Sequence, residues 1–188
     1  MVSCHMAYRE EAFDHFDSIF CVGPHHIDEI REREKKAGLP PKKLIKHGYG
    51  RLDQQLEILN RIKKRPARPL DVAGRVLIAP SWGENGLLER TGANFIEPLL
   101  ELGYEVVLRP HPQTRRFSPT LLDNIELRYA TKSNFRLDED MSSSVSLLAA
   151  DIMISDWSGA ALEFAFAFER PVLFIDVPRK INNSKYLQ

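Results

Sequence analysis

The feature that most constrains the fold of this chain is a regular alternation of short apolar segments and helical patterns over residues 75–175. The apolar segments are hydrophobic throughout, which predicts strands buried on both faces. Strands that alternate with helices form parallel sheets covered on both sides. We therefore expect an α/β fold with a doubly wound, Rossmann-like parallel sheet. Its expected strands are 75–79, 105–108, 125–128, 151–155 and 171–175, and its expected helices are 93–102, one from about 118, 142–149 and 160–168.

The N-terminal part of the chain follows a different pattern. Apolar segments at 17–23 and 43–46 predict two short strands, and the charged stretch at 26–37 predicts a helix between them. Residues 54–63 also have helical spacing. This part therefore has elements of its own, outside the regular alternation that follows it.

A basic run with two prolines at 63–69 is typical of a linker. We place the domain boundary there, between residues 1–68 and residues 69–188. The pattern begins with a lone strand and stops soon after the last one, so we expect the chain to be a fragment of a larger protein.

Composition excludes several classes of function. The 26 Lys and Arg residues balance the 26 Asp and Glu residues, and the basic run at 63–68 has no interleaved aromatics, so we expect no nucleic-acid partner. No stretch approaches a membrane span and residues 1–10 lack the apolar core of a signal peptide, so any membrane contact would be peripheral. Cys4 and Cys21 lie outside metal-ligand spacing and favour a reducing, cytoplasmic setting. The sequence carries no metal-binding or Gly-rich cofactor motif, so we expect no metal and no cofactor.

In open parallel sheets, ligands bind at the carboxyl ends of the strands. The first predicted strand here is followed by a glycine-containing loop that starts with Ser81, Trp82 and Gly83. Backbone N–H groups of such a loop suit an anionic or hydroxyl-rich ligand. An ordinary turn between a strand and a helix is the alternative, and the loop by itself favours it.

Arg109 and His111 stand directly after the second predicted strand, and each of them precedes a proline. Prolines restrict the backbone and would hold both side chains in place. An arginine offers two parallel hydrogen bonds to a phosphate, and a histidine can donate a hydrogen bond or a proton near neutral pH. A histidine that only caps a helix is the alternative. Position, chemistry and rigidity together favour a functional pair.

The strongest candidate follows strand 151–155, where the chain passes through Ser155, Asp156, Ser158 and Gly159 into a helix. A helix N-terminus with hydroxyl side chains and no Cβ at the glycine suits a phosphate. Ser158 is expected to bind the phosphate or to cap the helix, two roles that overlap.

Two neighbours of this turn have open interpretations. Glu163 lies about one turn into the helix, where it could accept hydrogen bonds from a ribose, or simply be a surface glutamate. Trp157 could stack on a base or pack against the protein. The sequence does not decide between these roles.

Four motifs, taken in order, resemble the CDP-glycerol glycerophosphotransferase family. They are Gly-Tyr-Gly-Arg-Leu-Asp at 48–53, Ile-Ala-Pro-Ser-Trp at 78–82, Arg-Pro-His-Pro at 109–112, and Ser-Asp-Trp-Ser-Gly at 155–159 followed by Arg-Pro-Val-Leu at 170–173. The resemblance implies a GT-B fold, with residues 69–188 as its C-terminal, nucleotide-donor-binding lobe and residues 1–68 as the end of the N-terminal lobe and the interlobe linker. It also implies transfer of glycerol phosphate, or a related polyol phosphate or sugar, from a CDP-linked donor to a cell-surface polymer such as teichoic acid.

The resemblance assigns contacts with the donor phosphates to His111 and Ser158. We expect His111 and Arg109 to stabilise the charge that develops on the leaving nucleoside phosphate, a task that needs no metal. The family's general base would lie upstream of Met1, on a missing lobe that also binds the acceptor polymer. The chain alone is therefore expected to bind a nucleotide without catalysis, in the cytoplasm at the inner face of the plasma membrane.

Two other functions stay open. The same region is similar to UDP-N-acetylglucosamine 2-epimerases, in which a Ser-Gly pair binds phosphate and a glutamate like Glu163 holds the ribose. The teichoic-acid enzymes usually have Ser-Ser where this chain has Ser158 and Gly159, so a nucleotide sugar is an alternative donor, for an epimerase or a capsule glycosyltransferase. A non-catalytic nucleotide-binding module is the third possibility.

Overall fold

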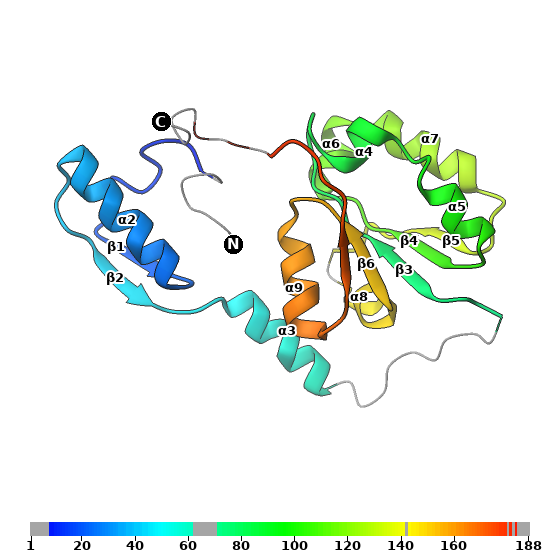
Figure 1. Cartoon of the computed structure of the whole chain (residues 1–188), viewed down its shortest axis with the longest axis horizontal. Coiled ribbons are helices and arrows are strands. Elements are labelled where there is room, and N and C mark those ends of the chain that lie inside the picture. Colours follow the sequence, from blue (N-terminus) through cyan, green and yellow to red (C-terminus); the bar gives the residue numbers. More distant parts are fainter. Residues whose placement is uncertain (1–7, 62–70, 142, 180, 182, 184–188) are drawn as a thin grey trace. The chain divides into compact units, whose positions relative to one another are not determined.

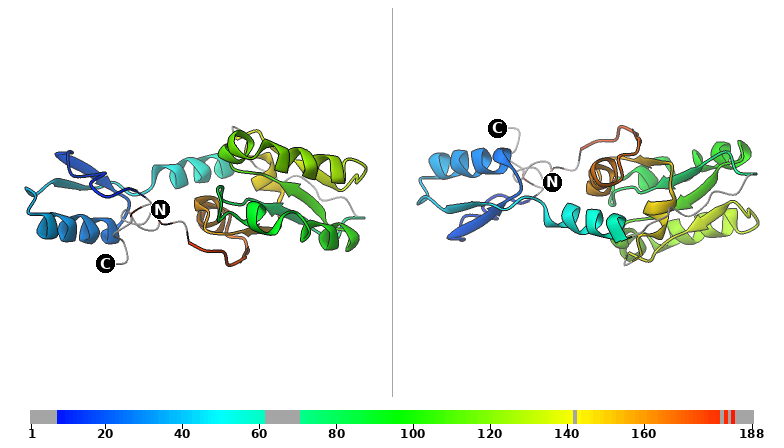
Figure 2. Two further views of the ribbon diagram at one scale, coloured as in Figure 1. Left: turned by 90° about the horizontal axis from the view of Figure 1, so that it is seen from above. Right: turned by 90° about the horizontal axis from the view of Figure 1, so that it is seen from below.

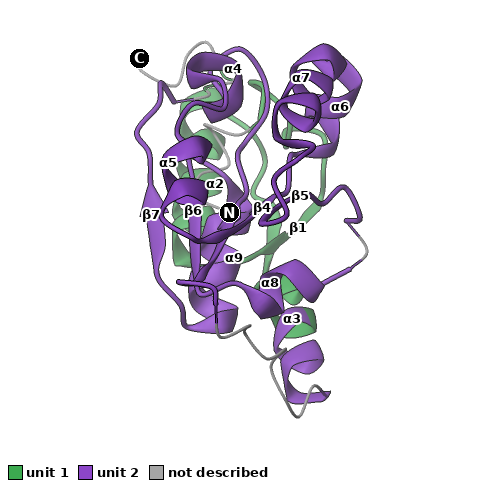
Figure 3. Cartoon of the chain, turned by 90° about the vertical axis from the view of Figure 1, so that its right-hand side faces the viewer, with its two compact units in different colours: residues 1–54, 180–188 green, residues 55–179 purple. Residues whose placement is uncertain are grey.

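The computed structural model describes residues 8–61, 71–141, 143–179, 181 and 183, and it divides the chain into two compact units (Figure 1, Figure 3). Unit 1 consists of Met1–Gln54 with Lys180–Gln188, and unit 2 consists of Gln55–Arg179. The expected linker at 63–69, the expected boundary between residues 68 and 69, and Cys4 lie outside the described residues.

Unit 2 contains a five-stranded sheet in which all four pairs of neighbouring strands are parallel. The strands are, from edge to edge, β5 (Phe135–Leu137), β4 (Glu105–Leu108), β3 (Arg75–Ile78), β6 (Ile152–Ser155) and β7 (Val172–Phe174). The strand of this sheet that comes first in the sequence, β3, lies in the middle, with later strands on both sides, so the direction of winding reverses between β3 and β6. This confirms the predicted doubly wound α/β fold.

Helices cover both faces of this sheet (Figure 1). The connections from β3 to β4 and from β4 to β5 run over one face, and those from β5 to β6 and from β6 to β7 run over the other, because parallel crossovers are right-handed. The first face carries α4 (Leu87–Thr91), α5 (Ile96–Glu101), α6 (Pro112–Phe117) and α7 (Pro119–Tyr129), and the second carries α8 (Val145–Ala149) and α9 (Gly159–Phe168).

The two-sided covering explains why three of the four residues in each of the central strands β3, β4 and β6 are buried. Val76 and Ile78 pack with residues of α4, α5 and α7 in the main core. The residue between them, Leu77, points to the opposite face because successive side chains of a strand alternate. It is fully buried there, as are Met153 of β6 and Phe164 of α9.

The prediction of a strand at 125–128 is wrong. This segment belongs to α7, in which Leu122, Ile125 and Tyr129 form one buried stripe at helical spacing while Leu127 is 78% exposed. The strand that follows is β5, which begins only at Phe135. The short helices α4 and α6 were not predicted, because neither is long enough to show a periodic pattern.

Unit 1 contains a pair of parallel strands, β1 (Ser18–Cys21) and β2 (Lys43–Lys46), joined through α2 (Pro24–Ala37). The expected strands and helix in this part are confirmed. The helix α3 (Gly50–Arg61) starts before the predicted residue 54, and the division between the units falls inside it. Among the described helices, none has both the length and the hydrophobicity of a transmembrane segment.

Buried charges hold unit 1 together. Glu34 of α2 accepts hydrogen bonds from the Arg31 guanidinium at 2.7 Å and from the Lys42 amide at 2.8 Å. The Lys42 ammonium in turn donates to the carbonyl oxygens of Asp14 and Phe16. This charge network, in which Glu34 and Lys42 are buried, therefore ties the segment before β1 and the start of β2 to α2.

Candidate functional site

The predicted site residues lie at one edge of the unit 2 sheet. His111 follows β4, Ser158 follows β6, and the loop that starts at Ser81 follows β3, which lies between the other two strands. All three strands are parallel, so their carboxyl ends share an edge, and the ends of β4 and β6 are about 10 Å apart, two strand spacings. The winding reverses at this place, which is where open α/β sheets bind ligands.

Asp156 joins two of these strand ends. Its carboxylate accepts hydrogen bonds from the amide of Ser81 at 2.7 Å, from the hydroxyl of Ser81 at 2.8 Å and from the amide of Leu87 at 2.8 Å. Ser155 next to it donates its hydroxyl to the carbonyl oxygen of Ala79 at 2.6 Å. Both side chains are buried, and their observed contacts are with protein. They support the loop after β3 from the protein interior. The contact with the donor phosphate that we expect for Ser155 and Asp156 stays a prediction.

The glycines of the loop after β3 serve the loop itself. Gly83 has a φ of 100°, which residues other than glycine rarely adopt. A Cβ at Gly86 would lie 3.0 Å from the carbonyl oxygen of Gly83 and 2.4 Å from a carboxylate oxygen of Glu89. The backbone conformation thus favours glycine at Gly83, and the neighbouring carbonyl oxygens leave little room for a side chain at Gly86, whether or not a ligand binds there.

Trp82 fixes the position of His111. The indole stacks on the imidazole with ring centroids 5.9 Å apart and planes inclined by 27°. It also stacks on Phe117, the last residue of α6, at 5.6 Å and 18°. Trp82 therefore packs against both ends of α6, and the place near the donor that we expect for the loop containing it stays a prediction.

His111 caps α6 through its Nδ1 atom. Its Nδ1 accepts a hydrogen bond from the amide of Gln113 at 3.1 Å. An imidazole nitrogen that accepts carries no proton, so the neutral ring has its proton on Nε2, which is then a donor. The capping role that the sequence left open is thus observed, and it sets the tautomer that a hydrogen bond to a phosphate requires.

Ser158 caps α9 in the corresponding position after β6. Its hydroxyl oxygen accepts from the amide of Ala160 at 3.3 Å, and its own amide donates to the carbonyl oxygen of Asp156 at 2.7 Å. The first N–H groups of a helix have no intrahelical acceptor and carry a partial positive charge. Ser158 and the start of α9 together can bind an anion.

Gly159, the first residue of α9, has no structural need to be glycine. Its φ lies outside the left-handed region, and a Cβ placed on it would meet no atom within 4 Å. Glu163 lies four residues later and hence on the same side of the helix. An exposed glycine at a helix N-terminus, with a carboxylate one turn away, leaves room for a ligand to approach the backbone.

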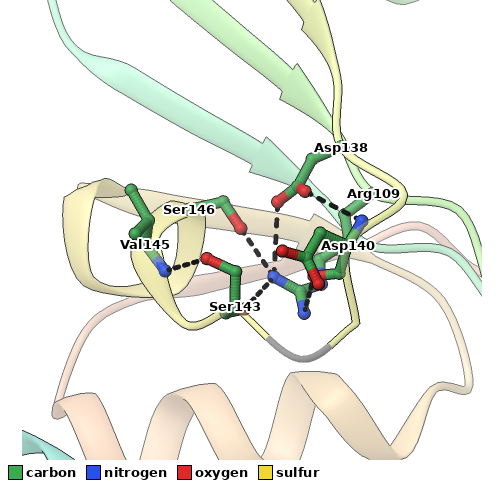
Figure 4. Close-up of polar contacts among 6 residues, drawn as sticks. All are labelled: Arg109, Asp138, Asp140, Ser143, Val145 and Ser146. Atoms are coloured by element: carbon green, nitrogen blue, oxygen red, sulfur yellow. Dashed lines mark hydrogen bonds and ion pairs between the residues drawn. The ribbon is translucent and has the colours of Figure 1, made fainter.

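Arg109 is buried, with 7% of its surface exposed, and both of its terminal nitrogens are occupied by protein oxygens (Figure 4). Its partners lie on Asp138, Asp140, Ser143 and Ser146. The predicted hydrogen bonds from Arg109 to a donor phosphate stay a prediction. What the structure shows is an arginine that holds the connection between β5 and α8.

Sequence reasoning missed another arginine at this edge. The Arg179 guanidinium lies 4.7 Å from the ring centroid of Trp157, the residue directly before Ser158. Trp157 donates its indole N–H to the carbonyl oxygen of Val177 at 2.9 Å, so it packs against the segment after β7. Arg179 is brought here because Val177 is buried in the main core, and no pattern around residue 179 could have shown that.

The arginine of the Arg-Pro-Val-Leu motif has a structural role. Arg170 donates to the carbonyl oxygens of Leu147, Leu148 and Ala150, and so satisfies the C-terminal end of α8. In the described part of the chain, no three His, Cys, Asp or Glu side chains are grouped as a metal site would require. The expected absence of a metal and of a cofactor stays a prediction.

Comparison with known proteins gives a family match over most of the chain. Residues 11–179 match the family described as CDP-Glycerol:Poly(glycerophosphate) glycerophosphotransferase. No curated protein sequence matches the chain significantly.

Solved structures of the wall teichoic acid polymerase TagF resemble the fold. A histidine-to-asparagine variant of that protein matches with a TM-score of 0.52 and 19% identity, over 85% of this chain and 39% of its own. Another TagF structure matches with a TM-score of 0.49 and 20% identity, over 85% of this chain and 38% of its own. The chain thus spans about two fifths of the length of these proteins, and the likeness concerns the fold alone.

Proposed function

Because the chain belongs to the CDP-glycerol:poly(glycerophosphate) glycerophosphotransferase family, we propose that it supplies the donor-binding lobe of a transferase that moves glycerol phosphate from CDP-glycerol to a growing cell-surface polymer. The observation that carries the proposal is the placement of two helix-capping side chains, His111 and Ser158, after the strands on either side of β3. Each places a polar side chain at the edge where the winding of the sheet reverses.

In this proposal the diphosphate of the donor lies at the start of α9. The Ser158 hydroxyl donates to its oxygens at the positive end of the helix dipole, and Gly159 allows the backbone to come close. Arg179, next to Trp157, adds a positive charge on the same side of the turn. Glu163 accepts hydrogen bonds from the ribose hydroxyls.

His111 acts on the leaving group. An acceptor hydroxyl attacks the phosphorus that bears glycerol, the bond from this phosphorus to the bridging oxygen breaks, and CMP leaves with the electron pair. Negative charge therefore builds up on the CMP phosphate, and the Nε2–H of His111 stabilises it by a hydrogen bond. The tautomer needed for this is set by the hydrogen bond from the Gln113 amide.

The remaining parts of the reaction belong to the rest of such an enzyme. We propose that the general base and the acceptor polymer are provided by another lobe, and that the reaction takes place in the cytoplasm at the inner face of the plasma membrane. The chain by itself then binds the donor and does not turn it over.

Calorimetric titration of the chain with CDP-glycerol, CMP and UDP tests the proposal. We expect CDP-glycerol and CMP to bind and UDP to bind more weakly. His111→Asn keeps an oxygen that can cap α6 and removes the imidazole, so it should weaken CDP-glycerol binding about tenfold or more while the protein stays folded. Arg128→Lys, which is on α7 and outside the site, is the control and should bind as the unchanged chain does.

Each other result has a definite meaning. A folded chain that gives no heat with any of the three nucleotides contradicts the proposal. Preference for UDP would favour the epimerase or glycosyltransferase alternative, which the Ser158–Gly159 pair and Glu163 support. In a full enzyme, transfer that is unaffected by His111→Asn would leave a binding module as the better description.

A further inference from the structure

The Arg109 guanidinium lies at the centre of a buried cluster of hydrogen bonds with the connection between β5 and α8 (Figure 4). One terminal nitrogen donates to the Ser143 carbonyl oxygen at 2.8 Å, to the Ser146 hydroxyl oxygen at 2.8 Å and to the Asp138 carboxylate at 3.3 Å. The other donates to the Asp140 carbonyl oxygen at 3.1 Å. We refer to residues 138–141 and 143–146 as the β5–α8 segment.

The course of this segment takes it past the candidate site. It leaves the carboxyl end of β5 at the edge of the sheet, where the Asp138 amide donates to the Leu108 carbonyl oxygen of β4. It then enters α8, which packs against β3 on the face of the sheet opposite to α6 and α7. The segment therefore crosses the carboxyl edge of the sheet beside the strand that leads to His111.

A second arginine ties the same segment to the helix that His111 caps. Arg115 of α6 makes two parallel hydrogen bonds to the Glu139 carboxylate, at 2.7 and 2.9 Å. This pair is more exposed than the Arg109 cluster, with 33% of the Arg115 side chain and 42% of the Glu139 side chain accessible. Exposed ion pairs stabilise little. We therefore expect the buried hydrogen bonds of Arg109 to determine the position of the segment.

We propose that Arg109 is a positioning residue, which clamps the β5–α8 segment against the His111 turn so that this segment forms one wall of the donor site. The inference rests on the function proposed above. It gives Arg109 a task different from direct phosphate binding: the arginine acts on the donor through the backbone that it holds in place.

The chemistry of the cluster favours a clamp over a ligand. A guanidinium that grips a phosphate must present two parallel N–H groups to it. In Arg109 the Nη1 atom makes three hydrogen bonds to protein oxygens and the Nη2 atom makes one, and two of these four oxygens are backbone carbonyls of the segment, so the pair of N–H groups at the end of the side chain faces the protein. The Asp138 carboxylate, whose side chain is 7% exposed, balances the charge within the cluster.

Substitution of a buried partner separates the two roles. Ser146 is 2% exposed and its hydroxyl accepts from Arg109, so Ser146→Ala loosens the clamp without removing a group that could touch the donor. We expect Ser146→Ala to weaken CDP-glycerol binding several-fold and Arg109→Lys to weaken it about tenfold, because lysine cannot reach this set of acceptors at once. The double variant should bind no more weakly than Arg109→Lys alone, since both changes act on one cluster.

Hydrogen exchange of the protein without nucleotide gives the second measurement. The amides of the β5–α8 segment should exchange several-fold to about tenfold faster in both variants, and the Arg128→Lys control should change neither exchange nor binding. Affinities are compared at a temperature at which each variant is fully folded, so a loss of stability alone cannot imitate the effect.

The inference is overturned if Ser146→Ala binds CDP-glycerol as well as the unchanged chain does while Arg109→Lys loses binding, because Arg109 would then touch the donor itself. It is also overturned if exchange of the segment is the same in all variants. If the unchanged chain binds no nucleotide, the proposed function fails, and exchange of the segment still shows whether Arg109 clamps it.

Discussion

At the scale of single residues, the site divides into side chains that support it and side chains that can meet a ligand. Asp156, Ser155 and Arg109 are buried and use their polar atoms on neighbouring loops. Ser158 and His111 lie nearer the surface, each with its cap bond oriented by the backbone. A buried polar group must be satisfied within the protein, so the most buried members of a motif become its framework.

Gly159 gives the sharpest prediction at this scale. Gly159→Ala meets no steric hindrance from the described residues and replaces the poorest non-proline helix former with the best. We expect it to leave the free energy of unfolding unchanged or to raise it by up to about 1 kcal/mol. If a diphosphate approaches the backbone there, the added methyl group should weaken CDP-glycerol binding at least about tenfold. Urea unfolding and calorimetric titration measure the two effects, and a variant that binds normally would exclude close approach at Gly159.

At the scale of elements, short segments depend most on their surroundings. Residues 125–128 were expected to form a strand, yet they continue α7 because Leu122, Ile125 and Tyr129 fit the core on one helical face. The Tyr129 hydroxyl also donates to the carbonyl oxygen of Ala93 at 3.0 Å. Tertiary packing thus overrides a local pattern.

The charge network of unit 1 predicts acid sensitivity. Burial by itself would raise the pKa of Glu34, but hydrogen bonds from Arg31 and from the Lys42 amide outweigh it, and the pKa lies below its ordinary value. The hydrogen bond from Arg33 likewise lowers the pKa of Asp14. A folded-state pKa below the unfolded one stabilises the protein above the unfolded value, and this stabilisation is lost as the pH falls through the folded value. Unit 1 should therefore lose stability below about pH 4.

Glu34→Gln tests the origin of this sensitivity. The variant should be less stable at pH 7 by roughly 2 kcal/mol, because a buried charged acceptor is lost. Between about pH 5 and about pH 3, its free energy of unfolding should fall less than that of the unchanged chain. Amide resonances of α2 during thermal unfolding report on unit 1. Glu32→Gln changes an exposed carboxylate on the same helix and is the control. An unchanged dependence on pH in Glu34→Gln would show that other groups cause it.

At the scale of the whole molecule, stability and binding should be separable by unit. The predicted site residues belong to unit 2, as do both tryptophans of the chain, Trp82 and Trp157. Unit 1 has its own strand pair and charge network. Tryptophan fluorescence therefore reports on unit 2, and resonances of α2 report on unit 1.

CDP-glycerol should stabilise the two units unequally. A ligand that binds only the folded state at a hundred times its Kd adds about 2.7 kcal/mol, which corresponds to an increase of about 10 °C in the Tm of a domain of this size. We expect this shift in the fluorescence transition and a much smaller one in the α2 resonances. Equal shifts in both would mean that the units unfold together, and no shift in either would contradict donor binding.

The sequence by itself determined the elements with long or continuous apolar patterns and the edge of the sheet where polar loops meet. Residues 105–108 and 43–46 were predicted to the residue, and the alternation of strands and helices predicted the doubly wound fold class. This was possible because period and burial are properties of neighbouring residues in the chain. The family resemblance was carried by short motifs at the strand ends, and the family match over residues 11–179 confirms it.

Only the tertiary structure decided which polar residues support the site and which face a ligand. Arg109 meets partners 29 to 37 residues away, and Asp156 meets partners 69 and 75 residues away. Arg179 reaches Trp157 because Val177 is buried in the core. A side chain's hydrogen-bond partners depend on how distant segments pack, and a pattern of neighbouring residues holds no record of that packing.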